Sequence, residues 1–281
     1  MSISLIAWVK VEDGKLVTRN FGDELSYHLL KLLADCPVAI RGQPGSEQST
    51  CELLFIGSIL HSLTTENCVV WGSGVIAADR RIAVKPRRIC AVRGPLSRQK
   101  LLDQGIECPE VYGDPALLLP LVYRPTIRRR YKIGIIPHQV ETSLPTVLEF
   151  HRGNPNVLIL KPERYGHWKT FVNKIASCDL ILSSSLHGLI VADAYGVPNV
   201  WIKLSHDKVI GGEFKFCDYF QGVGRDYVPP VDFSDGIDLD LLKIGQGRRG
   251  PLKFDRLAFL KPCPFPLRKG ITEAAAVKGQ M

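Results

Sequence analysis

The sequence predicts an α/β fold of two Rossmann-like domains with a cleft between them. Its length of 281 residues exceeds the size that a single hydrophobic core usually fills, so two units of roughly 120–150 residues are expected. Short apolar runs recur along the chain, each followed by a turn rich in Gly, Ser, Pro or His, and several of these turns lead into a helical pattern. This alternation is typical of doubly wound parallel sheets.

The apolar runs are the expected strands. Each is short and bounded by turn-forming residues, which suits strands that helices cover on both faces. They lie at residues 53–56, 69–71, 89–92, 133–136, 157–160, 180–182 and 200–202. The first ten residues lack a basic segment and a small-residue cleavage site, so we expect a further buried strand there rather than a signal peptide.

Helical patterns follow several of these runs. Residues 96–102 form one that ends at Gly105, and residues 189–195 form another that ends at Gly196 with a proline just beyond. A glycine followed by a proline is a strong stop signal for a helix. An amphipathic pattern covers residues 27–33.

The segment 119–130 is the expected domain boundary. It contains two prolines and a run of three arginines, and it shows no clear periodicity. We therefore expect an N-terminal domain near 1–122 and a C-terminal domain near 123–250. The last stretch, 251–281, is expected to be an irregular basic tail that either wraps onto the first domain or lies on a membrane surface.

The chain is basic, with 36 Lys and Arg against 28 Asp and Glu for a formal net charge of +8. Such a charge favours phosphates, anionic lipid surfaces or acidic metabolites as partners. No aromatic residues interleave the basic ones and no known nucleic-acid module is present, so nucleic acid is not an expected partner. No apolar run reaches the ~18 residues of a transmembrane helix. The eight scattered cysteines suit a reducing cytoplasm.

The turn 183–188, Ser-Ser-Ser-Leu-His-Gly, is the most informative one. It follows the expected strand 180–182 and opens a helix, and open α/β sheets bind their ligands at such carboxyl ends of strands. Ser184 or Ser185 could cap this helix, and His187 would then lie in its first turn. The unpaired N–H groups and the positive helix dipole there attract anions and lower the pKa of a histidine. His187 could bind a phosphate or carboxylate or donate a proton; the alternative is a helix cap beside an incidental histidine.

Arg93 follows the expected strand 89–92 in the same way. Pro95 suits the first helical position and Gly94 the cap, which leaves the arginine at the end of the strand and aimed into the cleft. A guanidinium there could clamp a carboxylate or a phosphate through two hydrogen bonds. A surface ion pair is the alternative interpretation.

Two further turns carry weaker signals. Asp23 stands just before the expected helix 27–33, where it could cap the helix or orient a hydroxyl group of an acceptor. Ser73 and Gly74 follow another strand, and the backbone N–H groups of their turn could cradle an anion. The glycine spacing of that turn is not that of a dinucleotide site.

Three polar residues follow other apparent strands. Asp114 and His138 could contact substrate or simply stabilise their turns, and Lys215 could contact substrate or remain solvated. No metal site is expected, because the histidines and carboxylates show no ligand spacing.

In this order the motifs resemble those of the polysaccharide pyruvyl transferase family. The resembling segments are N-F-G-D at 20–23, W-G-S-G at 71–74, R-G-P-L-S at 93–97, G-D-P-A at 113–116, S-S-L-H-G at 184–188 and F-K-F-C-D-Y at 214–219. The resemblance spans roughly residues 18–222, and the S-S-L-H-G turn is its most specific element. One departure is the Gly94-Pro95 pair, which stands where many relatives are expected to carry an acidic residue.

The resemblance implies a two-domain fold like that of GT-B glycosyltransferases, with the acceptor on the N-terminal side and the donor on the C-terminal side. It implies transfer of a pyruvyl group from phosphoenolpyruvate to a sugar of an exopolysaccharide or cell-surface glycan repeat unit, which gives a pyruvate ketal. No cofactor is implied beyond phosphoenolpyruvate as the donor substrate. The acceptor would be a lipid-linked oligosaccharide or polysaccharide, which suggests a cytoplasmic protein in peripheral contact with the inner face of the membrane.

On this resemblance His187, Asp23 and Arg93 are the expected catalytic residues. His187 would supply an acid or hold the phosphate, Arg93 would clamp an anionic group, and Asp23 would assist the acceptor hydroxyl. The expected substrate-binding residues are Ser73, Gly74, Asp114, His138, Ser184, Ser185 and Lys215.

Two other functions fit the same expected architecture. A GT-B glycosyltransferase would use a nucleotide sugar at the same anion site, and a UDP-sugar would then stabilise the protein where phosphoenolpyruvate would not. A catalytically silent module would bind acidic glycans or anionic lipid without any dependence on a donor.

Overall fold

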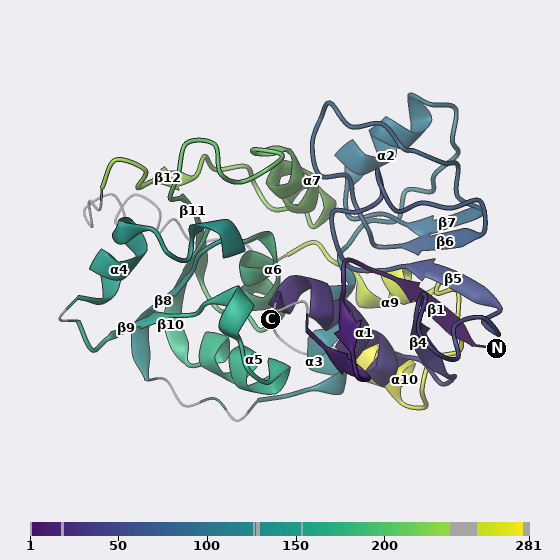
Figure 1. The fold of residues 1–281 in the computed structure, drawn as a ribbon, viewed down its shortest axis with the longest axis horizontal. Coiled ribbons are helices and arrows are strands. Elements are labelled where there is room, and N and C mark those ends of the chain that lie inside the picture. The colour runs from purple at the N-terminus through teal and green to yellow at the C-terminus, as the bar shows by residue number, and fades with distance from the viewer. Residues whose placement is uncertain are drawn as a thin grey trace.

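The computed structural model describes residues 2–17, 20–125, 127, 130–152, 154–236 and 252–277. It contains two five-stranded sheets and one small two-stranded sheet. Figure 1 shows the two large sheets in separate halves of the molecule, one purple to blue and the other teal to green. The predicted α/β fold with parallel sheets is confirmed. Arg128, Arg129 and the expected end of the second domain at 250 lie outside the described residues.

The first sheet has the strand order β4-β1-β5-β6-β7, and every neighbouring pair is parallel. Its strands are β1 (Ile3–Ile6), β4 (Val38–Ile40), β5 (Cys51–Leu54), β6 (Cys68–Trp71) and β7 (Arg88–Ala91). The antiparallel hairpin of β2 (Val11–Glu12) and β3 (Lys15–Leu16) follows β1. The expected first strand is therefore present, and the side chains of β1 and β6 are all buried, as strands covered on both faces require.

The second sheet has the order β12-β11-β10-β8-β9, again with every pair parallel. Its strands are β8 (Tyr131–Ile136), β9 (Val157–Ile159), β10 (Cys178–Ser183), β11 (Asn199–Lys203) and β12 (Val231–Asp232). Both sheets follow the same doubly wound pattern, in which the direction of strand addition reverses beside the first strand. The reversal lies between β1 and β5 in one sheet and between β8 and β10 in the other. Ligands of open α/β sheets bind at the carboxyl ends of the strands beside such a reversal.

Helices follow most of these strands. They are α1 (Phe21–Leu33), α2 (Pro95–Leu102), α3 (Leu119–Val122), α4 (Pro145–His151), α5 (Trp168–Ala176), α6 (Leu186–Ala194) and α7 (Phe214–Gly222), with the 3-10 turns η1 (Pro115–Leu118), η2 (Gln139–Glu141) and η3 (Pro162–Arg164). The predicted helices at 96–102 and 189–195 are confirmed as α2 and α6. The first helix begins at Phe21 rather than near 27, because the Asn20 side chain caps it by accepting a hydrogen bond from the Gly22 N–H.

Helices from the two halves pack against each other. Helix α7 of the second half contacts α2 of the first, and α6 contacts η1. Phe21 of α1 packs on Phe171 of α5 with their ring centroids 4.4 Å apart. The contact of α6 with η1 and the Phe21–Phe171 contact belong to one hydrophobic core that contains residues of both halves.

The described part of the C-terminal segment returns to the first half. Its helices are α9 (Arg256–Leu260) and α10 (Ile271–Ala276), drawn in yellow in the half of the molecule that carries the first sheet (Figure 1). The Trp71 indole N–H donates to the Phe259 carbonyl at 3.1 Å, and Leu267 forms a β-bridge with Ala34. Of the two expectations for this segment, the structure shows wrapping onto the first half.

The expectation that this segment is irregular needs correction. Asp255 caps α9 by accepting hydrogen bonds from the Leu257 and Ala258 N–H groups. With only 5 and 6 residues, α9 and α10 are too short to produce a readable helical periodicity.

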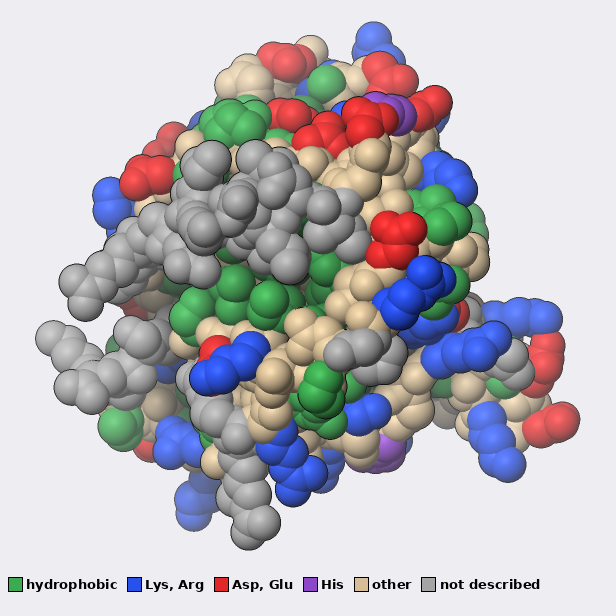
Figure 2. Space-filling model, turned by 90° about the vertical axis from the view of Figure 1, so that its left-hand side faces the viewer, with side chains coloured by type: hydrophobic (Ala, Val, Ile, Leu, Met, Phe, Trp, Pro, Cys, Tyr) green, Lys and Arg blue, Asp and Glu red, His purple; other side chains and the backbone are tan. Residues whose placement is uncertain are grey.

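Acidic and basic side chains lie mainly on different parts of the end of the molecule that carries α4 and β9. Figure 2 shows that end, with acidic side chains mainly near the top of the view, Lys and Arg mainly near the bottom, and hydrophobic side chains between them. Within the described ranges, no helix is long and apolar enough to cross a membrane.

Candidate active site

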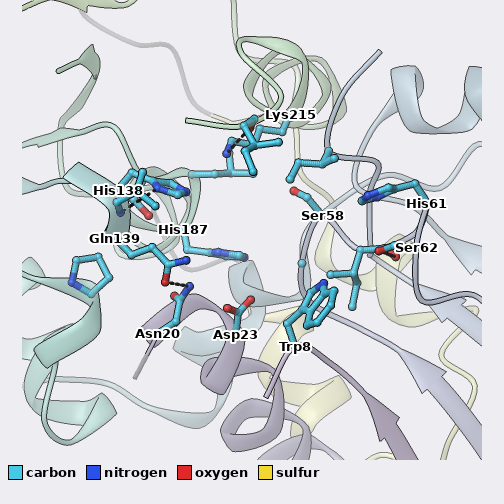
Figure 3. A pocket seen from close by; sticks show the side chains of 18 of the residues that line it. Trp8, Asn20, Asp23, Ser58, His61, Ser62, His138, Gln139, His187 and Lys215 are labelled. Carbon is cyan, nitrogen blue, oxygen red and sulfur yellow. Dashed lines mark hydrogen bonds between the residues drawn. The ribbon is translucent and has the colours of Figure 1, made fainter. Parts of the chain in front are cut away.

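A pocket of about 460 Å³ lies where the two reversal points face each other. Trp8, which follows β1, and the turn at 57–62, which follows β5, line one wall. Residues 138–140 after β8 and residues 185–187 after β10 line the opposite wall. Figure 3 shows these side chains directed into the pocket from both halves. The general rule for open α/β sheets therefore locates this pocket.

Two helices begin at this pocket. Asp23 lies in the first turn of α1 and His187 in the first turn of α6. The two turns touch, because a Cβ added to Gly22 would lie only 2.3 Å from His187 Nδ1. The positive ends of two helix dipoles thus converge on the imidazole ring. Such convergence favours an anionic ligand.

His187 occupies its predicted place, and its surroundings keep it neutral. Its side chain is 15% exposed, with Nε2 3.8 Å from Asp114 Oδ2, which is too long for a hydrogen bond. Nε2 has no hydrogen-bond partner among the residues that the structure describes. Burial, followed by the positive charges of Arg93 and Lys215, lowers the pKa of His187 to about 3. A bound anion would raise that pKa and attract a proton to the ring.

Asp23 is the carboxyl group at the centre of the pocket floor (Figure 3). Asn20 is the helix cap, so the interpretation of Asp23 as the cap is wrong. Within the described part of the chain, Asp23 forms no hydrogen bond or ion pair. Burial, with a smaller contribution from Glu24, raises the pKa of Asp23 to about 7. A carboxyl group with such a pKa can both give and accept a proton at neutral pH.

Lys215 brings a positive charge from α7 to the pocket wall. Its side chain is buried, and its Nζ donates to the Ile210 carbonyl at 3.2 Å, so the solvated alternative is wrong. Burial and then Arg93 lower the pKa of Lys215 to about 8, which leaves the ammonium mostly charged at neutral pH. His138 faces it, and burial together with Lys215 lowers the pKa of His138 to about 4.

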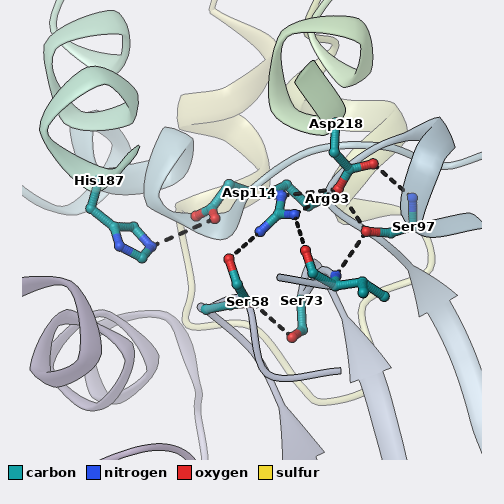
Figure 4. A network of polar contacts seen from close by, with 9 residues as sticks. Ser58, Ser73, Arg93, Ser97, Asp114, His187 and Asp218 are labelled. Atoms are coloured by element: carbon teal, nitrogen blue, oxygen red, sulfur yellow. Dashed lines mark hydrogen bonds and ion pairs between the residues drawn. The ribbon is translucent and has the colours of Figure 1, made fainter. Parts of the chain in front are cut away.

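Arg93 is not free in the cleft, contrary to expectation. Its side chain is 1% exposed, and its NH2 group lies 2.9 Å from the fully buried carboxylate of Asp218. Its Nε also donates to Asp218, its NH1 donates to Ser58 Oγ at 2.6 Å and its NH2 to the Val75 carbonyl at 2.6 Å. The surface ion-pair interpretation is wrong as well, because the pair is buried (Figure 4). Arg93 lies behind the pocket and holds Ser58, which lines it.

The Ser73–Gly74 turn does not cradle an anion. The Gly72 N–H donates to the Ala91 carbonyl and the Gly74 N–H to the Gly57 carbonyl. Ser73 Oγ donates to the same Gly57 carbonyl at 2.9 Å. These donors are occupied, and the turn instead fixes the segment that carries Ser58 into the pocket.

The two predicted serines of the α6 turn have different roles. Ser185 is the N-cap residue, but its side chain makes no capping hydrogen bond, whereas Ser183 Oγ accepts from the Ser185 N–H at 3.0 Å. Ser184 Oγ donates to Glu141 at 2.5 Å and accepts from the His138 N–H at 2.9 Å. The predicted cap is therefore Ser185, although its hydroxyl makes no capping hydrogen bond, and Ser184 positions the His138 loop.

Half of the predicted residues reach the pocket surface. Its lining includes Asp23, His138, Ser185, His187 and Lys215. The residues behind that lining are Ser73, Gly74, Arg93, Asp114 and Ser184. Asp114 caps η1 by accepting from the Ala116 N–H at 2.9 Å, which is the turn-stabilising alternative.

One wall of the pocket was not predicted from the sequence. Ser58, His61 and Ser62 line the pocket from the turn that directly follows the expected strand 53–56. The strand-end rule that singled out His187 would have found this turn. Arg80 and Lys208 also line the pocket, but no local motif marks them.

No metal cluster is evident in the described ranges, where no group of three or more His, Cys, Asp or Glu residues is placed to hold an ion. The structure describes all eight cysteines, and none of them forms a disulfide bond.

Comparison with known proteins finds the same family that the sequence motifs resemble. The sequence model of the polysaccharide pyruvyl transferase family matches residues 20–206. An uncharacterized protein of Acanthamoeba polyphaga mimivirus, L143, is 28% identical over 219 residues, which cover 74% of this chain and 72% of that protein. The succinoglycan biosynthesis protein ExoV of Rhizobium meliloti (strain 1021) is 28% identical over 219 residues, which cover 75% of this chain and 63% of ExoV. This chain therefore belongs to the polysaccharide pyruvyl transferase family.

Proposed function

We propose that this protein transfers the pyruvyl group of phosphoenolpyruvate to a sugar of an exopolysaccharide or cell-surface glycan repeat unit, and so forms a pyruvate ketal. Family membership supports pyruvyl transfer, and the relative ExoV is named for succinoglycan biosynthesis. The observation that carries the proposal is the convergence of two helix starts on His187, with Asp23 and Lys215 lining the same pocket.

The donor carries a phosphate and a carboxylate, and the pocket offers matching groups. The N–H groups at the start of α6 and the Lys215 ammonium would bind the phosphate. His187, whose lowered pKa keeps it neutral, would gain a proton as the anion binds and then donate a charge-assisted hydrogen bond to it. We therefore assign His187 to phosphate binding and to protonation of the departing phosphate.

Asp23 is proposed as the acid and base on the reacting carbon. Its protonated carboxyl would donate a proton to the methylene carbon of phosphoenolpyruvate, which leaves C2 cationic. An acceptor hydroxyl oxygen then bonds to C2, and the Asp23 carboxylate takes the hydroxyl proton. A second hydroxyl of the sugar then bonds to C2 and closes the ketal ring as the C2–O bond to phosphate breaks. His187 would give its proton to the departing phosphate and take the proton of this hydroxyl in return. In net terms one hydroxyl proton is transferred through Asp23 to the new methyl group and the other through His187 to phosphate.

Arg93 is proposed as a positioning residue in place of an anion clamp. Its guanidinium joins Ser58 on the pocket wall to Asp218 on α7. Through that link it would fix the relative placement of the Ser58 wall and the helix that carries Lys215.

The finer architecture and setting are proposals as well. We propose a GT-B-like division near residue 122, with the acceptor bound mainly by the N-terminal part and the donor mainly by the C-terminal part. The two parallel sheets, drawn from residues 3–91 and 131–232, support this division. A lipid-linked acceptor at the inner face of the cytoplasmic membrane would suit the net charge of +8.

Thermal unfolding with separately titrated phosphoenolpyruvate, inorganic phosphate and UDP tests the donor. At ~100 times its dissociation constant a ligand adds about 2.7 kcal/mol to the free energy of unfolding. We expect phosphoenolpyruvate to stabilise the wild type, His187→Ala to lose that effect, and the exposed control His206→Ala to retain it. Stabilisation by UDP alone would contradict the proposal and favour a nucleotide-sugar glycosyltransferase. Binding of glycan or lipid with no response to any donor would favour a non-catalytic module.

A further inference from the structure

Trp8 has surroundings unlike those of the other tryptophans. Its side chain is 58% exposed, whereas Trp71, Trp168 and Trp201 are buried. Each of the other three packs against an aromatic ring, as Trp201 does on Phe216 at 4.5 Å. Among the ring contacts of the described residues, none involves Trp8. Its indole face is therefore free of aromatic stacking partners and is accessible to a ligand.

The exposed indole lies in the pocket rather than on a general surface. Trp8 is part of the pocket lining, and Figure 3 shows its ring between Asp23 and Ser62 on the side of the pocket that the first half provides. His61 and Ser62 add polar groups on the same side of the pocket as the ring (Figure 3), and Arg80 is also part of the pocket lining. A flat aromatic face bordered by hydrogen-bonding groups is complementary to a pyranose, which has an apolar C–H face and a rim of hydroxyls.

We propose that Trp8 is the stacking platform for the acceptor sugar, and that it holds the ring with its hydroxyls directed toward Asp23. This inference rests on the proposed transfer to a sugar and deepens it by assigning the acceptor subsite. Trp8 precedes the segment 20–206 that the family model matches, so membership of the family does not assign this residue.

Acrylamide quenching of tryptophan fluorescence tests the subsite directly. Trp8 is the one exposed tryptophan of the four in the chain, so collisional quenching reports mainly on it, and Trp8→Phe confirms the source of the signal. The probes are methyl β-D-glucopyranoside, methyl β-D-galactopyranoside and cellobiose, with sorbitol as a polyol that has no ring. We expect at least one glycoside to reduce quenching where sorbitol does not. Quenching that no glycoside reduces more than sorbitol would overturn the inference, as would protection by phosphatidylglycerol vesicles alone.

Substitutions of Trp8 distinguish the contribution of the aromatic ring to binding from that of apolar volume alone. Trp8→Ala and Trp8→Leu should each weaken binding of the protecting glycoside, measured by calorimetry, by about tenfold. Trp8→Phe should retain most of the affinity. The matched control Tyr227→Ala, which removes an aromatic side chain that is 49% exposed away from the pocket lining, should leave it unchanged. Equal affinity in Trp8→Leu and wild type would overturn the stacking role.

Thermal unfolding with phosphoenolpyruvate distinguishes failure of the acceptor subsite from failure of the proposed function. Phosphoenolpyruvate should stabilise Trp8→Ala as much as the wild type, because Trp8 and His187 lie on opposite sides of the pocket (Figure 3). If phosphoenolpyruvate stabilises both proteins and no glycoside protects Trp8, only the acceptor subsite is wrong. If phosphoenolpyruvate stabilises neither protein, the proposed function fails on its own evidence.

Discussion

The starts of α2 and α6 are two sites that look alike in the sequence and differ in the structure. Each helix follows the carboxyl end of a parallel strand after a short turn of two or three residues. At α6 the first turn faces the pocket, and His187 Nε2 has no hydrogen-bond partner among the described residues. At α2 the Ser97 N–H and hydroxyl already donate to Asp218 at 2.8 and 2.6 Å. One helix start is open to a ligand and the other is filled by the protein.

Asp218 fills the α2 site because α7 packs there. Gly94 permits the approach, since a Cβ at that position would lie 1.8 Å from the Asp218 backbone oxygen. Asp218 also forms an ion pair with Arg93, whose guanidinium would otherwise be free to bind a ligand in the cleft. The comparison shows that a strand-end turn marks a possible anion site, while distant packing decides whether a ligand can use it.

Arg93→Ala should produce the largest change, and it should be a change of stability. The substitution leaves the fully buried Asp218 carboxylate without its cation, which typically costs about 3–5 kcal/mol. Urea unfolding measures the loss. The control Arg41→Ala breaks a partly exposed pair with Glu52, whose atoms are 3.6 Å apart, and should cost at most about 1 kcal/mol. Equal unfolding midpoints for the two variants would show that Arg93 is not a structural partner of Asp218.

Gly94→Ala and Gly22→Ala should have different effects, because Gly94 lies at the filled start of α2 and Gly22 contacts the open start of α6. At Gly94 the new Cβ meets backbone, which cannot easily give way, so the free energy of unfolding should fall by about 1–3 kcal/mol. At Gly22 it meets the His187 ring, which can turn aside, and alanine favours the helix by about 1 kcal/mol. Gly22→Ala should therefore stay close to wild type in urea unfolding yet lose binding of phosphoenolpyruvate. Loss of stability without loss of binding at Gly22 would contradict the placement of His187.

The pH dependence of stability should show two smaller and opposite effects at the open site. Burial raises the pKa of Asp23 from 3.8 to about 7, so the folded state binds more protons and this contribution to stability falls as pH rises through that range. Burial lowers the pKa of His187 from 6.5 to about 3, so its contribution falls as pH decreases through that range.

Urea unfolding between about pH 4 and pH 8 separates the two effects, each expected at about 1–2 kcal/mol because both groups are partly solvated. The free energy of unfolding of Asp23→Asn, relative to that of the wild type, should increase as pH rises. That of His187→Gln, relative to the wild type, should increase as pH falls. Parallel stability curves for wild type and Asp23→Asn would show that the Asp23 pKa is not raised.

Local sequence signals predicted the fold and the open site. Alternating apolar runs and turns located most strands, and the small residues before His187 correctly predicted the first turn of a helix. These features depend on neighbours within a few residues. The partner of Arg93 lies 125 residues away, so no local pattern could reveal that its guanidinium is occupied. Trp8 was missed for a related reason, since one aromatic residue after a strand does not show whether its ring is buried.

The most direct test of this account is calorimetric titration of phosphoenolpyruvate into three proteins: wild type, His187→Ala and Ser97→Ala. His187 and Ser97 lie in the first turns of α6 and α2, respectively. Ser97→Ala should unfold more easily, because it breaks a hydrogen bond to buried Asp218, but it should bind the donor as the wild type does. His187→Ala should lose binding by about tenfold or more, as loss of a charge-assisted hydrogen bond of about 1.5–3 kcal/mol predicts. Undiminished binding by His187→Ala together with loss of binding by Ser97→Ala would place the anion at the α2 start and contradict the account.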